Sequence, residues 1–123
     1  MQQQIKERTK RIGLDVIQLI DELPQKTAAY IIGRQLVRCS TSVGANYRAA
    51  CRGKSLPDFI NKLKIVEEEA DETLYWFEML EESGFVKKER LEPLKKETNE
   101  ILSIVVSSIK TAQSRNTNPK SKI

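Results

Sequence analysis

Residues 34–76 read RQLVRCSTSVGANYRAACRGKSLPDFINKLKIVEEEADETLYW, and this stretch carries the densest helical pattern of the chain and its sharpest separation of charge. No acidic residue occurs in residues 23–57, whereas residues 58–82 contain nine acidic residues and only two lysines. The contrast predicts a basic helix followed directly by an acidic one. It indicates how the two helices fit together, but it does not by itself reveal a reaction.

The predicted basic helix spans residues 27–52, with Thr27 as its N-cap. At about 100° per residue, its apolar side chains fall on one side and four arginines on the other. These arginines lie within about 80° of arc and along about 27 Å of helix axis. Guanidinium groups form forked hydrogen bonds with phosphate and keep their charge at any relevant pH. The residues predicted to bind nucleic acid are Arg34, Arg38, Arg48, Arg52 and Lys54.

The same arginines have a second interpretation, because the helix that follows them is acidic. They could pair with Glu68, Glu69 or Glu72 of this chain or of a neighbouring subunit, and little positive surface would then remain. Tyr30 and Tyr47 are not placed as a stacking platform for bases, so the sequence gives no support for base-specific readout.

The predicted acidic helix spans residues 56–83, with Ser55 as its N-cap. Four of its apolar side chains fall about 120° or more from the stripe that faces the core. A second apolar strip is typical of a partner surface, although a loop or tail could also cover it. The predicted oligomer interface consists of Ile65, Tyr75, Trp76 and Met79, with Leu14 and Ile17 on the first helix.

Two further amphipathic patterns flank this central pair. The predicted helices span residues 3–23, 27–52, 56–83 and 89–114. Four helices joined by short turns predict an all-α fold, an antiparallel up-down-up-down four-helix bundle, as one domain of residues 1–114. Residues 115–123 have no apolar period and no acidic residue, so we expect a disordered basic tail.

Composition limits the chemistry open to this chain of 123 residues. It contains no histidine, the commonest general base and transition-metal ligand. It has neither a phosphate-binding glycine loop nor a nucleophile beside a base, so we predict no catalytic residue, no cofactor and no enzymatic activity. Cys39 and Cys51 would lie about 18 Å apart along one helix, which is too far for a disulfide. The net charge of +4 permits an acidic partner without requiring one.

The acidic run at residues 67–72 is a candidate for a carboxylate-bridged iron or manganese site, because helix bundles can hold such metals between inward-facing glutamates. Those sites normally need Glu-x-x-His pairs, and most of these acids lie off the core stripe. We therefore predict no metal site, with a metal-dependent bundle enzyme as a distant alternative. No run is apolar enough to cross a bilayer, and the N-terminus lacks a secretory core, so a cytoplasmic protein without a membrane segment is expected.

Two segments, RQLVRCSTSVGANYRAACRGKS and DFINKLKIVEEEADETLYWFEML, closely resemble the four-helix-bundle family of 23S ribosomal RNA intervening-sequence proteins. The resemblance combines Arg38, the run at residues 42–46, Phe59, the pairs at residues 62–63 and 67–68, and Trp76 in order. It implies a bacterial, cytoplasmic bundle that assembles as a homo-oligomer, typically a pentamer. Relatives include accessory proteins of diversity-generating retroelements, which implies RNA or DNA and a protein as partners.

Two functional hypotheses follow. The first is a non-enzymatic, oligomeric helical bundle that binds nucleic acid, structured or ribosomal RNA, through its basic arginine face. The second is a protein-interaction scaffold, or accessory subunit, whose partner binds the nucleic acid.

Overall fold

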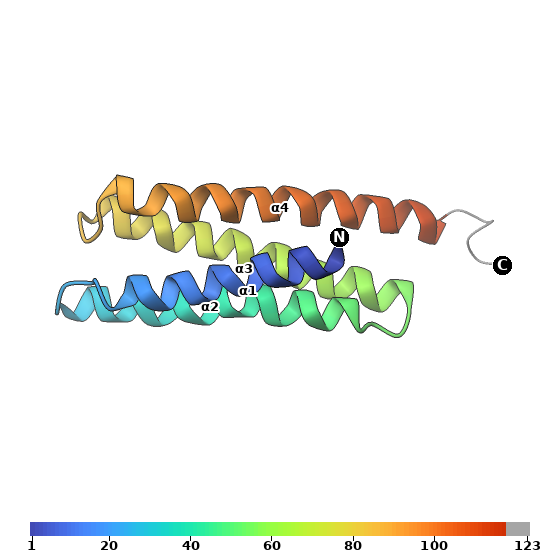
Figure 1. Ribbon diagram of the computed structural model, residues 1–123, viewed down its shortest axis with the longest axis horizontal. Coiled ribbons are helices and arrows are strands. Elements are labelled where there is room, and N and C mark those ends of the chain that lie inside the picture. Colours follow the sequence, from blue (N-terminus) through green and yellow to red (C-terminus); the bar gives the residue numbers. More distant parts are fainter. Residues whose placement is uncertain (118–123) are drawn as a thin grey trace.

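The computed structural model describes residues 1–117 and confirms the predicted fold class, an all-α four-helix bundle with no strand in that range (Figure 1). The helices are α1 (Gln2–Ile20), α2 (Thr27–Cys51), α3 (Leu56–Glu82) and α4 (Lys88–Thr117). Successive helices run in opposite directions because the turns between them are short. The central pair is α2 and α3, with α1 packed on α2 and α4 packed on α3.

The helices differ in length, and this leaves one end of the bundle without α1. With 19 residues, α1 is shorter than α4, which has 30. In Figure 1 the N-terminus lies part of the way along the bundle, and the other three helices extend past it. The α2–α3 turn and the C-terminal end of α4 are therefore together at this end.

Two clusters of buried apolar side chains fill the interior. One includes Leu19, Leu36 and Phe77, towards the α1–α2 and α3–α4 turns. The other includes Leu63 and Ile101 and continues towards the opposite end. The four buried serine and threonine side chains donate to carbonyl groups of the preceding turn of their own helix. Because every buried side-chain polar atom within residues 1–117 has a partner, the core contains no orphaned group that would indicate a ligand.

Helices α1 and α2 approach each other closely at Gly44. A Cβ atom at this position would lie 3.1 Å from the backbone nitrogen of Lys10 and 3.2 Å from its Cα atom. Because these are backbone atoms, a change of rotamer could not relieve the contact. A glycine at this position therefore sets the spacing of the two helices.

The N-terminal ends of α2 and α3 are capped differently. Ser55 is the N-cap of α3, as predicted, and its Oγ accepts a hydrogen bond of 3.2 Å from the backbone N–H of Asp58. Thr27, by contrast, was predicted as the N-cap of α2 and is instead its first helical residue. Lys26 occupies the cap position, and its side chain makes no cap hydrogen bond.

Two predicted C-terminal ends also differ from the structure. Helix α1 ends at Ile20 rather than at residue 23. The backbone N–H groups of Glu22 and Leu23 donate to carbonyl groups three residues earlier, and Pro24 disfavours helical backbone at Leu23. Helix α4 continues to Thr117, past the predicted end at residue 114. Neither glycine nor proline occurs in residues 94–117, and Arg115 is favourably placed against the helix dipole. The first three residues of the predicted disordered tail are therefore helical, and the rest of that tail lies outside the described residues.

Charged side chains connect α1 to α4, where the backbones share few contacts. Arg8 forms two hydrogen bonds with Glu97, of 2.9 and 2.7 Å, and one of 2.9 Å with Glu100. Near the other end, Arg90 forms two hydrogen bonds of 2.8 Å with Glu22. The guanidinium group of Arg8 holds the pKa of Glu97 below its usual value. Ion pairs thus bridge α1, and the turn that follows it, to α4.

Candidate nucleic-acid and assembly surfaces

The arginines predicted as a basic face are all exposed on α2 or directly after it, but they fall into two groups. Arg34 and Arg38 lie on adjacent turns of the helix. Arg48 and Arg52 lie at its C-terminal end, with Lys54 in the turn that follows. About 15 Å of helix axis separates Arg38 from Arg48. The two groups have different surroundings.

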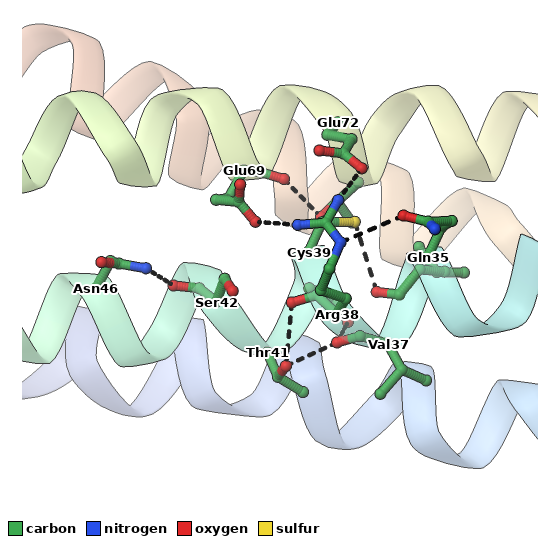
Figure 2. A network of polar contacts seen from close by, with 12 residues as sticks. Gln35, Val37, Arg38, Cys39, Thr41, Ser42, Asn46, Glu69 and Glu72 are labelled. Atoms are coloured by element: carbon green, nitrogen blue, oxygen red, sulfur yellow. Dashed lines mark hydrogen bonds and ion pairs between the residues drawn. The ribbon is translucent and has the colours of Figure 1, made fainter.

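Arg38 is paired within its own chain (Figure 2). Its guanidinium group reaches across to α3, where Nη1 donates to Glu69 Oε2 at 3.3 Å and Nη2 donates to Glu72. Its Nε donates to Gln35 Oε1 at 3.2 Å, so each of the three guanidinium nitrogens has an acceptor. This pairing was one of the two interpretations that the sequence left open. Arg38 therefore contributes little free positive charge to the outer face of α2.

Trp76 joins the same network and departs from its predicted position. Its Nε1 donates to Glu72 Oε2 at 3.0 Å, and its ring is half-buried and packs against the core cluster that contains Phe77. The sequence placed this side chain on the solvent face of α3. The indole is large enough to reach the α2–α3 seam from that position. The exposed strip on α3 is thus smaller than predicted, because Trp76 packs towards the core.

In the second group, Arg52 and Lys54 lie at the end of the bundle that α1 does not reach, whereas Arg48 lies beside the first turns of α1, at a hollow that Gln3 and Lys6 also line. Within residues 1–117, none of Arg48, Arg52 and Lys54 forms an ion pair. The nearest acid in sequence, Asp58, accepts a hydrogen bond of 3.3 Å from the backbone N–H of Lys54 and faces the first turn of α3. The charges of these cations are therefore open to solvent.

Three further basic residues lie at this end and were not part of the predicted site. Lys62 is on the first turns of α3, and Lys110 and Arg115 are near the end of α4. The apolar residues beneath them, Ala50, Ile60, Ile109 and Ala112, belong to one core cluster, so these helix ends lie together. The antiparallel order of the predicted helices was the signal that could have found them. We call this set the basic end: Arg48, Arg52, Lys54, Lys62, Lys110 and Arg115.

Two hollows lie on the outer side of the α1–α2 pair. The first has a volume of about 790 Å³, adjoins the α1–α2 turn, and includes Ile20, Tyr30 and Arg34 in its lining. The second has a volume of about 530 Å³ and is lined by residues that include Lys6, Lys10, Leu14 and Ile17. We call the two together the α1–α2 groove. Arg34 lies at the first hollow, with its guanidinium carbon 5.8 Å from the centre of the Tyr30 ring.

The predicted interface residues on α3 are exposed except for Trp76. Tyr75 is 51% exposed, Met79 is 38% exposed and Ile65 is 37% exposed. All three lie on the outer side of α3, away from both core clusters. We call them the α3 strip. Nothing within the described chain covers it.

The remaining titratable groups do not form a reactive centre. Burial raises the pKa of the Cys39 thiol, and burial together with the neighbouring Cys51 raises the pKa of Tyr47 to about 12. Both cysteines are free thiols. Over residues 1–117, no three His, Cys, Asp or Glu side chains are grouped to hold a metal ion. In the same range, no helix is both long and apolar enough to cross a membrane.

Comparison with known proteins gives one family and a related crystal structure. The sequence profile of the family described as 23S rRNA-intervening sequence protein matches residues 1–118. A crystal structure from Bacteroides thetaiotaomicron VPI-5482, of a protein of unknown function from the S23 ribosomal protein family, superposes with a TM-score of 0.82 at 32% sequence identity. The match covers 89% of this chain and 97% of the other. No curated protein matches the chain.

Proposed function

Because the chain belongs to the 23S rRNA-intervening sequence protein family, we propose that it is a non-enzymatic helical bundle that binds RNA in the cytoplasm through its basic end. The observation that carries the proposal is that cations at the basic end have no ion-pair partner. Arg48, Arg52 and Lys54 have no carboxylate partner among the described residues, whereas Arg38 is paired with two. Unpaired cations gathered from three helix ends suit a phosphate backbone.

The surroundings of the basic end favour structured RNA over a single strand. The exposed tyrosines, Tyr30 and Tyr75, lie on other parts of the surface, and Tyr47 is buried. Without an exposed aromatic ring, the basic end has no platform on which an unpaired base could stack. Double-stranded RNA is bound mainly through its shape, phosphates and 2′-hydroxyl groups, which arginine and lysine can contact.

Arg34 belongs to the predicted site but lies apart from the basic end. About 21 Å of helix axis separates it from Arg48. It lies beside Tyr30 at the first hollow of the α1–α2 groove, where the other lining arginine is the paired Arg38. The proposal for RNA therefore depends on the basic end and treats Arg34 as a separate contact.

Binding of a labelled hairpin transcribed from 23S ribosomal RNA, measured by fluorescence anisotropy, tests the proposal. The double variant Arg52→Ala/Lys54→Ala should weaken binding at least tenfold, because two phosphate contacts are lost. The control Lys87→Ala/Lys88→Ala removes the same charge from the α3–α4 turn and the first residue of α4, and it should leave binding nearly unchanged. Equal losses in both variants would mean that only net charge matters and would contradict the proposal. A DNA hairpin of the same sequence distinguishes RNA from DNA as the partner.

A second candidate function is a protein-interaction scaffold, and the α3 strip is the observation that favours it. Three exposed apolar side chains on one helix are typical of a partner surface. In this proposal the chain is a homo-oligomer, a pentamer by family resemblance, and a partner protein contacts the nucleic acid. A bundle that assembles in solution without binding either hairpin would favour this candidate.

A further inference from the structure

The first hollow of the α1–α2 groove has the size and the lining of a small-molecule site. Its volume of about 790 Å³ is within the usual range for ligand pockets. It lies where the α1–α2 turn meets the start of α2, and its apolar lining is mostly aliphatic. The main apolar residues of the lining are Ile20, Leu23, Pro24, Ala29, Tyr30 and Val37.

The hollow is elongated along α2. The residues of this helix that line it run from Thr27 to Arg38, which is about 17 Å of helix axis. On the other side, the end of α1 and the turn pack directly on Gly33, where an added Cβ atom would lie 3.2 Å from Leu23 Cδ1 and 3.3 Å from Ile20 Cδ1. A long, narrow apolar floor suits an extended chain better than a compact ring system.

The charged side chains at this hollow are all of one sign. Among the described residues that line it, Lys26, Arg34 and Arg38 are cationic and none is acidic. The two acids of the adjoining turn are not part of the lining, and one of them, Glu22, is bound by Arg90. The hollow therefore favours an anionic ligand.

Arg34 is the cation that remains free to bind such a ligand. Arg38 is already paired with two glutamates, and Lys26 Nζ lies 6.0 Å from the centre of the Phe85 ring. Arg34 is exposed and makes no ion pair within residues 1–117. Its contact with the face of Tyr30 leaves its N–H groups without an acceptor.

We propose that this hollow binds a fatty acid, with the carboxylate on Arg34 and the alkyl chain along the apolar lining towards Pro24. A guanidinium group binds a carboxylate through two parallel hydrogen bonds. From Arg34 back to Thr27 there is about 10 Å of helix axis, which gives room for a chain of medium length. A phosphate of RNA could also reach Arg34, but its polar surroundings would leave the aliphatic lining without a partner.

The fatty-acid site is separate from the basic end. Arg52 and Lys54 do not line this hollow, so a ligand there leaves both cations accessible. The inference does not depend on the RNA proposal, and either can fail without the other.

Isothermal titration with decanoate and decanamide tests the carboxylate contact. The two probes share one alkyl chain, and only decanoate is charged. Below the concentration at which micelles form, the protein should bind decanoate one-to-one and decanamide about tenfold more weakly. Arg34→Gln should weaken decanoate binding about tenfold and leave decanamide binding within twofold. The control Arg11→Gln removes the same charge from an exposed position of α1 outside the hollow, so it should change neither.

A second pair of variants tests the apolar lining. Leu23→Ala should weaken both probes by a similar factor, because it removes part of the surface that the alkyl chain covers. Ile31→Ala is the control, since Ile31 is exposed on α2 and does not line the hollow. Circular dichroism checks the fold of each variant. Should Leu23→Ala fail to fold, the comparison at the exposed Arg34 still decides the question.

Amide chemical shifts recorded during the titration locate the ligand. With decanoate, the largest changes should occur at Ala29 and Gly33. Changes centred on Gly44 would place the ligand in the second hollow and would overturn the inference. It would also be overturned by a wild type without saturable decanoate binding, by equal affinities for the two probes, or by equal losses in Arg34→Gln and Arg11→Gln.

Discussion

Arg38 on α2 and Glu72 on α3 form an ion pair within one subunit, and Trp76 donates a hydrogen bond to the same carboxylate. Both partners lower the pKa of Glu72, with Arg38 as the larger cause. One arginine of the predicted basic face is therefore used to join α2 to α3. The next arginines along the helix, at the basic end, have no such partner in residues 1–117.

This difference predicts opposite effects for two arginine substitutions. Arg38→Ala should leave RNA affinity within twofold of wild type and should lower the free energy of unfolding by up to about 1 kcal/mol, because the Arg38 side chain is 49% exposed. Arg52→Ala should weaken RNA binding and leave stability unchanged. Urea unfolding and anisotropy on both proteins provide the comparison. A larger loss of RNA affinity for Arg38→Ala would contradict the assignment.

Tyr75 and Trp76 are neighbours in sequence with different predicted roles. Trp76→Ala removes a half-buried ring from the α2–α3 seam and leaves a hydrogen-bonded carboxylate short of one donor. It should destabilise the monomer by about 2 kcal/mol or more. Tyr75→Ala should leave the monomer stable and weaken self-association. Thermal melting and sedimentation on each variant separate the two effects, and the reverse pattern would show that the indole is the interface residue.

Gly44→Ala tests whether close helix packing outweighs helix propensity. Alanine favours a helix over glycine by about 1 kcal/mol, so the change would stabilise an unconstrained helix. The added Cβ meets backbone atoms of Lys10, so we expect a net destabilisation of about 1–3 kcal/mol. Ala45 is the exposed neighbour of Gly44, and the substitution Ala45→Gly measures the contribution of helix propensity alone to the free energy of unfolding. A Gly44→Ala protein that unfolds at higher urea concentration than wild type would refute the packing argument.

The Arg8–Glu97 pair predicts a pH dependence of stability. The folded-state pKa of Glu97 lies below its unfolded value, so its contribution is complete above about pH 4.3 and is lost as the pH falls through the folded pKa. Wild type should therefore exceed Glu97→Gln in stability at pH 7 and lose that advantage in acid. Urea unfolding of both proteins at several pH values measures this difference in the free energy of unfolding. Glu92→Gln, whose Lys88 partner is 3.9 Å away and exposed, is the control and should show a smaller difference.

The fold was predictable because apolar residues recur at three- and four-residue steps in all four helices. Leu36, Leu63 and Phe77 were all placed in the core by that spacing, and all three are fully buried. Helix ends were harder to predict where no capping or breaking residue marks them. Ser55 marks the start of α3 correctly, whereas nothing in residues 114–117 signals where α4 ends.

The surfaces were only partly predictable. Helical geometry places Arg38 and Arg48 on the same face, but it does not say which carboxylates a neighbouring helix brings within reach. That depends on the rotation of α3 about its axis, which turns Glu69 and Glu72 towards Arg38. The same rotation brings Trp76 to the seam. Contributions from distant segments, such as Lys6 in the groove or Lys110 at the basic end, become visible only when the bundle is assembled.

The salt dependence of RNA binding tests the central claim most directly. Phosphate contacts release counterions, so the logarithm of the association constant should fall linearly with the logarithm of salt concentration. Measured with the 23S ribosomal RNA hairpin, Arg52→Ala/Lys54→Ala should reduce that slope by up to about two units relative to wild type. Lys87→Ala/Lys88→Ala should leave the slope as it is. An unchanged slope for the basic-end variant, or an equal reduction in the control, would show that RNA does not contact these cations.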